Sequence, residues 1–167
     1  TYAAPLPVTS RALPPIALWD VAGQLGDSSI VVGAPPSYPL RPLRGIVVSC
    51  AMTPPDTDVF TFPPALSVGL RADGYQFDLR EPAGSDPAVL LEHAATITRQ
   101  RFSLLRKLVM TEPWRLAILV DPTLDRLQHA LWHEPELVQQ HYAVIDGEVE
   151  RLLAQLDPAT VVAIVSD

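Results

Sequence analysis

Two kinds of hydrophobic pattern alternate along the second half of the chain. Residues 115–121 and 160–167 are nearly continuous apolar runs that end in an aspartate, as expected of strands buried on both faces of a sheet. Between them, residues 123–133 and 135–156 have the apolar spacing of helices. The order strand, helix, helix, strand predicts a parallel α/β sheet, whose ligands gather at the carboxyl ends of the strands.

The first half is less regular, with short apolar strands separated by proline-rich loops. We predict a short helix that begins at Pro15 and ends before Gly26, because proline favours the first helical position and glycine follows helix ends. Strands are predicted over residues 30–32 and 45–49, and another short helix near Pro63 or Pro64.

A long helix is predicted from Pro87 to about Met110, with Asp86 as its N-cap. Charged residues on an amphipathic helix usually mark the side that faces water. We therefore expect four basic residues of this helix to face solvent. They are Arg99, Arg101, Arg106 and Lys107.

These elements predict an α/β fold with a mostly parallel sheet flanked by helices and a loop-rich cap insertion. Proline is concentrated before residue 65, and the regular helices come later. We interpret residues 1–50 as the start of the α/β core, 51–112 as a cap insertion with the long helix, and 113–167 as the core portion that carries the candidate site.

Composition excludes several classes of protein. Hydrophobic residues make up 48% of the 167, enough for a buried core, and no apolar run is long enough to span a membrane, so we expect a soluble domain. A net charge of −7 argues against binding of nucleic-acid polymers or anionic lipid. A single cysteine, Cys50, excludes an internal disulfide framework and a Cys-based zinc module.

The two ends suggest a piece of a longer protein. There is no initiator methionine before Thr1 and no visible targeting signal, and the apolar run of residues 160–165 stops where a loop should follow. The cysteine content favours a reducing, cytoplasmic compartment, while a signal sequence upstream of Thr1 stays open. The sequence predicts no oligomeric state.

Asp125 and His129 are the first candidate site residues. They are four residues apart on a predicted helix, so both side chains lie on one face, and a carboxylate and an imidazole are ligands for zinc or a similar ion. An ordinary exposed pair has the same spacing. His133 extends this face by another four residues, and the neighbouring Trp132 is typical of core packing.

Asp167 is the second candidate, because an ionised carboxylate directly after an apolar strand is costly to desolvate unless it is paired or bound to a cation. A solvated loop residue or an N-cap of a following helix is the alternative, and Asp121 has the same ambiguity. His93 and His141 are interpreted as surface or satisfied core residues. Cys50 and the serines lack the context of a nucleophile.

Several segments resemble the alkaline phosphatase superfamily and, within it, the type I phosphodiesterase/nucleotide pyrophosphatase group. The run LVDPTLDRLQHALW, which ends at Trp132, contains the Asp-x-x-x-His pattern of that group, and residues 160–167 are similar to its hydrophobic strand that ends in Ser-Asp-His-Gly. Residues 142–146 add to this more specific part of the resemblance, and looser similarities lie in residues 19–26, 34–39, 52–55 and 60–64.

The resemblance implies an alkaline phosphatase-like core, here partial, and a hydrolase that acts on a small-molecule phosphate ester or nucleotide. Asp125 and His129 would bind one ion of a two-metal centre, and Asp167 would bind the other; the ions would be zinc, with manganese as the alternative. His133 has no ligand counterpart in the family. Such centres activate a Ser or Thr nucleophile and clamp the oxygens of a phosphoryl transfer.

The nucleophile and the remaining metal ligands of the family have no counterpart in these residues, so we expect this fragment alone to be inactive. The substrate-binding residues stay unknown, because the sequence of the cap loops, which include Tyr38 and residues 52–62, does not indicate which substrate they contact. A phosphomutase of the same superfamily and a non-catalytic α/β binding domain are the alternatives.

Overall fold

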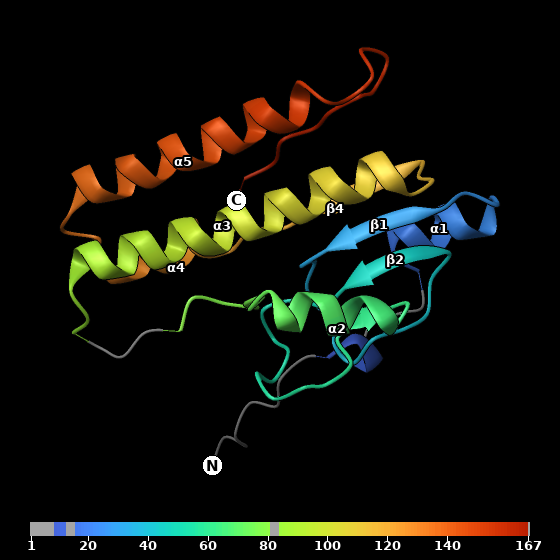
Figure 1. The fold of residues 1–167 in the computed structure, drawn as a ribbon, viewed down its shortest axis with the longest axis horizontal. Helices are drawn as coiled ribbons and strands as arrows, with labels where there is room; N and C mark the ends of the chain where they lie inside the picture. Colours follow the sequence, from blue (N-terminus) through green and yellow to red (C-terminus); the bar gives the residue numbers. More distant parts are fainter. Residues whose placement is uncertain (1–8, 13–15, 81–83, 167) are drawn as a thin grey trace.

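The computed structural model describes residues 9–12, 16–80 and 84–166 (Figure 1). In chain order the elements are a 3-10 turn (Ser10–Ala12), α1 (Leu18–Gln24), β1 (Ser29–Val32), β2 (Gly45–Val48), β3 (Thr61–Phe62), α2 (Ala65–Ala72), α3 (Pro87–Thr111), β4 (Leu116–Leu119), α4 (Thr123–Ala130) and α5 (Pro135–Leu153). The strands form one sheet in the order β3–β2–β1–β4. The predicted α/β fold is confirmed.

Strand β1 lies at the centre of the sheet and pairs in parallel with both β2 and β4, whereas β3 runs antiparallel to β2. Ile30, Val31 and Val32 are fully buried, and such β-branched side chains favour extended backbone. Because successive side chains of a strand point to opposite faces, Ile30 and Val32 join one core cluster and Val31 joins another.

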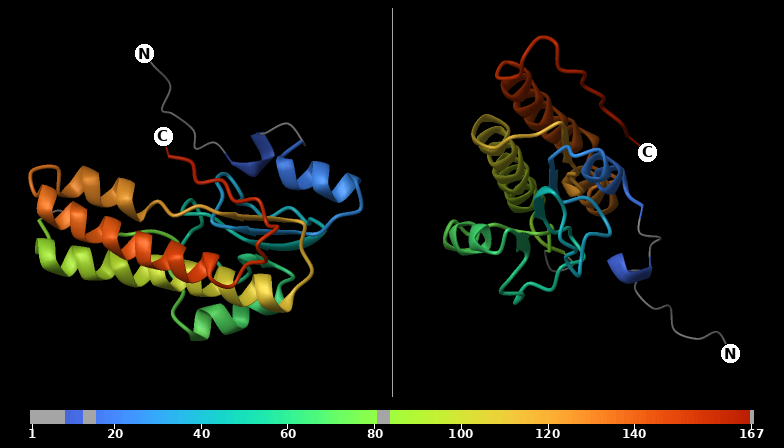
Figure 2. Two further views of the ribbon diagram at one scale, coloured as in Figure 1. Left: turned by 90° about the horizontal axis from the view of Figure 1, so that it is seen from above. Right: turned by 90° about the vertical axis from the view of Figure 1, so that its right-hand side faces the viewer.

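The helices cover both faces of the sheet, with α1 on one side and α3 on the other (Figure 2). On the α1 side, Val31 packs with Trp19. On the α3 side, Leu104, Leu105 and Leu108 pack in the cluster that contains Ile30. The sheet is therefore the middle layer, and α3 links it to the outer helices.

Helix α3 begins as predicted, because the Asp86 carboxylate accepts hydrogen bonds from the backbone amides of Ala88 (2.8 Å) and Val89 (3.4 Å). The expectation for its basic residues is only half right. Arg99 and Lys107 are exposed, as the pattern predicts.

Arg101 and Arg106 correct the expectation of a solvent-facing basic stripe. Arg101 is fully buried, and Arg106 forms an ion pair with the buried Glu148 of α5, to which Arg151 also binds at 2.6 Å. Both arginines lie on the sides of α3 that pack against other elements. Amphipathic spacing alone therefore misplaces them, because their carboxylate and carbonyl partners are distant in the sequence.

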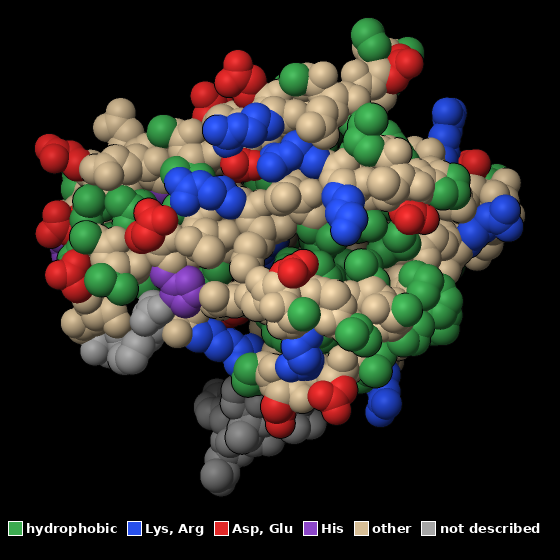
Figure 3. All heavy atoms as spheres, viewed as in Figure 1, with side chains coloured by type: hydrophobic (Ala, Val, Ile, Leu, Met, Phe, Trp, Pro, Cys, Tyr) green, Lys and Arg blue, Asp and Glu red, His purple; other side chains and the backbone are tan. Residues whose placement is uncertain are grey.

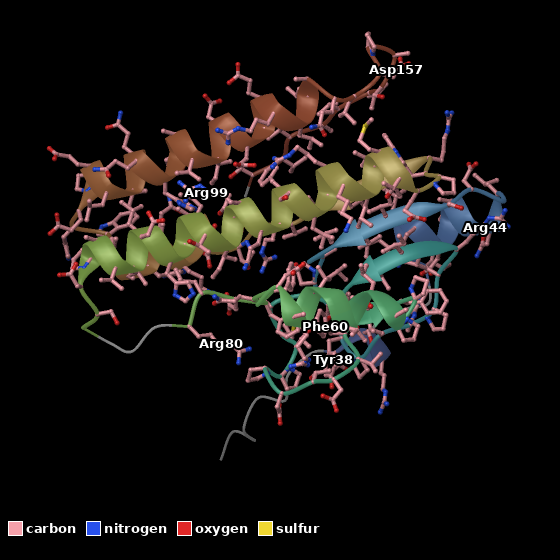
Figure 4. All side chains as sticks on the ribbon, in the orientation of Figure 1. Tyr38, Arg44, Phe60, Arg80, Arg99 and Asp157 are labelled. Atoms are coloured by element: carbon pink, nitrogen blue, oxygen red, sulfur yellow. The ribbon has the colours of Figure 1, made fainter. Side chains whose placement is uncertain are left out.

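An aromatic cluster fills the space below α2. The ring of Phe60 packs edge-on against Phe77 at a centroid distance of 4.8 Å and stacks on Tyr75 at 6.2 Å, and the Arg71 guanidinium lies 5.6 Å from the Phe60 centroid. Figure 4 shows Phe60 beside α2. Burial raises the pKa of the Tyr75 hydroxyl. Tyr75 and Phe77 lie between α2 and α3, so their packing on Phe60 holds this connecting segment in place.

The structure corrects three predictions in the last third of the chain. Residues 160–166 are extended but form no strand, and Val161, Ile164 and Val165 are 94%, 75% and 89% exposed. Figure 2 shows this segment (red) apart from the sheet in its right-hand view. An apolar run becomes a strand only when a neighbour supplies the ladder of hydrogen bonds, and here it has not joined the sheet.

The second correction concerns β4, which was expected to be buried on both faces. It lies at the edge of the sheet, next to β1 only, and all four of its residues are half-buried.

Helix α4 also ends at Ala130 rather than near His133, because a turn leads into the proline that starts α5. The predicted first helical position at Pro15 lies outside the described residues.

Gly33 lies directly after β1 at a position where the structure leaves no room for a larger side chain. Its φ is +73°, and a Cβ there would lie 2.6 Å from Arg101 Nη1 and 2.7 Å from the Val120 carbonyl oxygen. We expect Gly33→Ala to lower the free energy of unfolding by about 3 kcal/mol or more, because both strain and overlap add. Urea denaturation measures this value.

Gly26→Ala is the matched control, because Gly26 also has a positive φ of +88° but no atom within 4 Å of the added Cβ. It should cost only about 1 kcal/mol of conformational strain. Equal losses in the two variants would contradict the close approach of Arg101 to the β1 terminus.

Candidate functional site

The candidate site lies where β4 ends and α4 begins. Asp121 follows β4, and its Oδ1 accepts a hydrogen bond from the backbone amide of Thr123 at 3.1 Å. This bond satisfies one of the free amides in the first turn of α4. Asp121 therefore fixes the start of the helix that carries Asp125 and His129.

Three buried side chains connect Asp121 to helices α3 and α5. Thr98 Oγ1 of α3 donates to Asp121 Oδ2 at 2.6 Å, and it lies 2.8 Å from Thr123 Oγ1. Thr123 Oγ1 lies in turn 2.9 Å from Nε2 of His141 on α5. Thr98, Thr123 and His141 are all fully buried. The start of α4 is thus bonded to both long helices.

The number of hydroxyl protons fixes the direction of this chain. A carboxylate can only accept, so the single proton of Thr98 is used on Asp121, and Thr98 must accept from Thr123. Thr123 then has no proton left for His141, so His141 donates from Nε2. The order is His141 to Thr123 to Thr98 to Asp121, and it requires a proton on Nε2 of His141.

Arg101 supplies the positive charge next to Asp121. Its Nε lies 3.8 Å from Asp121 Oδ1, its Nη1 donates to the Val120 carbonyl at 3.0 Å, and its Nη2 donates to the Phe77 carbonyl. A buried carboxylate is tolerated when it is paired and hydrogen-bonded. We infer that Asp121, one of the ambiguous aspartates, has a structural role here.

Asp125 and His129 lie on the outer side of α4, as the spacing predicts. Asp125 Oδ1 is 3.3 Å from His129 Nε2, and the two side chains are 56% and 80% exposed. Asp125 Oδ2 also binds Arg126 at 3.1 Å. The structure brings this pair together, while Asp167 lies outside the described residues.

Arg126 ties the outer side of α4 to the loop before α3. Its Nε donates to Asp78 Oδ1 at 3.1 Å and its Nη2 to Asp78 Oδ2 at 3.3 Å. The pKa of Arg126 is raised, first by its hydrogen bond to Asp78. Because Arg126 holds Oδ2 of Asp125, the other oxygen, Oδ1, is left beside His129.

The donor atoms of this pair fit two ligands of a tetrahedral zinc ion. Ligand atoms about 2.0–2.1 Å from zinc, at the tetrahedral angle, are about 3.3 Å from each other. The 3.3 Å between Asp125 Oδ1 and His129 Nε2 matches this spacing. Within the described residues, no group of three or more His, Cys, Asp or Glu side chains could hold a metal ion, so His133 does not complete a set.

The residues Thr98, Arg101 and His141 were not predicted to belong to this region. They come from α3 and α5, and each meets Asp121 or Thr123 from at least 18 residues away in the sequence. His141 was interpreted as a surface or satisfied core residue; it is buried, and its Nδ1 has no hydrogen-bond partner among the described residues. The sequence contains no local signal for such a network.

The fold and the site define an α/β protein with a carboxylate–histidine pair just beyond the carboxyl end of a sheet strand. The family model for type I phosphodiesterase / nucleotide pyrophosphatase matches residues 14–167, and the chain belongs to this family. This confirms the resemblance drawn from the sequence. No curated protein and no solved structure matches the chain.

The family consists of phosphoric ester hydrolases that are generally metal-dependent, and a small phosphate ester or nucleotide fits it as the substrate. Among the described helices, none is both long and apolar enough to cross a membrane. Figure 3 shows acidic and basic side chains interspersed over the face that it draws.

His141 generates a prediction of pH dependence. Burial lowers its pKa below the ordinary value of 6.5; the negative charge of Asp121 opposes this shift, and the positive charge of Arg99 adds to it. The unfolded chain therefore binds a proton at a higher pH than the folded one. We expect the free energy of unfolding to fall as the pH drops below about 6.5.

Urea denaturation at a series of pH values measures this loss, and His141→Gln, which keeps a donor but has no titration, should make the dependence less steep. His133→Gln is the control, because His133 is exposed and its replacement should leave the slope unchanged. Identical slopes in wild type and H141Q would contradict a neutral, buried His141.

Proposed function

We propose that the protein is part of a metal-dependent phosphoric ester hydrolase in which Asp125 and His129 bind one divalent cation, zinc or manganese. The observation that carries this proposal is the 3.3 Å spacing of Asp125 Oδ1 and His129 Nε2 on the exposed side of α4. Membership of the family supports it independently.

Asp167 is proposed as a ligand of a second ion. The support is the resemblance of residues 160–167 to the strand that precedes a metal ligand in this family, together with the family match through residue 167. The exposed apolar side chains before it are consistent with a segment that packs elsewhere in the complete protein.

The residues of this chain have three tasks in the proposed reaction. His129 must present a neutral imidazole, and Asp125 an ionised carboxylate, to the cation. Arg126 orients Asp125 by holding Oδ2, so that Oδ1 and the imidazole nitrogen stay side by side. The bound ions would polarise the phosphoryl oxygens and activate the nucleophile and water.

The nucleophile is proposed to be a Ser or Thr outside these residues, because neither the serines nor Cys50 have a base beside them in the sequence pattern. Cys50 is also fully buried. The fragment alone is therefore proposed to be inactive, and the substrate is proposed to be a small phosphate ester or nucleotide.

Replacement of either ligand tests the proposal. In the full-length protein with zinc or manganese, Asp125→Ala and His129→Ala should each reduce hydrolysis of bis(p-nitrophenyl) phosphate to the background rate, because an incomplete ligand set loses the ion. Release of p-nitrophenolate measures the activity.

Exposed residues of the same types supply matched controls. Asp73→Ala and His133→Ala remove an exposed carboxylate and an exposed imidazole that lie outside the proposed ligand set, and both variants should keep wild-type activity. Wild-type rates in D125A and H129A would overturn the metal assignment.

A further inference from the structure

Helix α4 needs an anchor to present its two candidate ligands. It is only 8 residues long, and helices shorter than about 12 residues are marginal by themselves in water. Asp125 and His129 are its third and seventh residues, and both are exposed. Contacts between α4 and the rest of the protein must therefore set their direction: Arg126 binds Asp78 on the outer side, and other contacts lie on the buried side.

The buried side of α4 consists of Thr123 and Leu127, which are both fully buried and lie one turn apart. Leu127 packs in an apolar cluster with Leu90 and Ile97 of α3. Apolar contact is non-directional and tolerates sliding or rotation of the helix. Thr123, by contrast, makes directed bonds, which restrict both the rotation and the position of the first turn of α4.

We propose that Thr123 is a positioning residue for the Asp125–His129 pair, through its hydroxyl bonds to Thr98 and His141. This inference rests on the proposed function and extends it to three residues that do not contact the ion. They act through the backbone of α4, since a shift of Thr123 moves the whole first turn and with it Asp125.

The bond pattern explains why the hydroxyl matters more than the shape of the side chain. Thr123 accepts from His141 and donates to Thr98, and its own amide is held by Asp121. Valine has the shape of threonine but lacks the hydroxyl that joins His141 to Thr98, so His141 would keep only its longer 3.4 Å contact with Thr98 Oγ1. Serine would keep both bonds.

Three polar groups thus converge on Thr123, the first residue of α4. They are Thr98 of α3, His141 of α5 and Asp121 after β4. Buried hydrogen-bond networks of this kind rigidify the groups that they join. Removal of a group that hydrogen-bonds a metal ligand commonly lowers metal affinity by about 10- to 100-fold, and Thr123 acts on the ligands one step further away, through the backbone of α4.

Zinc titration of the metal-free full-length protein, followed by calorimetry, tests this inference. We expect Thr123→Val to weaken zinc binding at the site by about tenfold or more, and Thr123→Ser to restore wild-type affinity. Rescue by serine would show that the hydroxyl, and not the packing volume, orients the ligands.

Thr61→Val is the matched control for loss of stability. Thr61 is also buried, and its hydroxyl bonds to Ser67 and to the Pro63 carbonyl, but it lies on β3 and outside the network. T61V should be destabilised and keep its zinc affinity. Wild-type affinity in T123V would overturn the inference and leave the bonds a purely structural role.

Two further variants keep the outcomes distinct. If T123V does not fold, Thr98→Val is measured in its place, because that variant keeps the bond between Thr123 and His141. Weaker zinc binding in T98V supports the inference, and unchanged binding overturns it. Asp125→Ala tests the proposed function alone. Loss of zinc in D125A together with normal binding in T123V would reject only the positioning role.

Discussion

The carboxyl group of Asp121 at the end of β4 is the constraint on which the arrangement of this region depends. A carboxylate that is mostly removed from water must be hydrogen-bonded and paired. Asp121 accepts from the Thr98 hydroxyl and the Thr123 amide, and the positive charge of Arg101 lies nearby, with Nε 3.8 Å from Oδ1. These donors come from α3 and from the first turn of α4. The same carboxylate therefore determines where the chain turns from sheet to helix and how α3 lies across that turn.

The polar network has consequences on both sides of α4. Inside, it places a titratable His141 in the core and makes the packing of α3, α4 and α5 sensitive to acid. Outside, we propose that it fixes the rotation of α4, which determines where the Asp125–His129 pair points. A core determined by directed bonds, rather than by apolar contact alone, suits a helix whose proposed task is to hold two donor atoms at a fixed spacing.

Local signals allowed much of the fold to be predicted from the sequence. The Asp86–Pro87 start of α3, the apolar runs of β1 and β2, and the proline that begins α5 each lie within a few residues of the structure they specify. The pairing of Asp125 with His129 followed from helical spacing, as did their shared face. The family resemblance then gave this pair a chemical interpretation that spacing could not.

Features that depend on distant partners could not be predicted in this way. Arg101 has the charge of a surface residue, but its partners are a carboxylate and two carbonyls that only the tertiary fold brings near. Residues 160–166 have the composition of a buried strand, yet composition cannot supply the neighbouring strand. The most direct test of the central claim is anomalous diffraction at the zinc edge from crystals of the full-length protein grown with zinc. The account predicts an ion about 2.0–2.2 Å from a carboxylate oxygen of Asp125 and a ring nitrogen of His129; zinc bound only elsewhere, with this pair left in mutual contact, would contradict it.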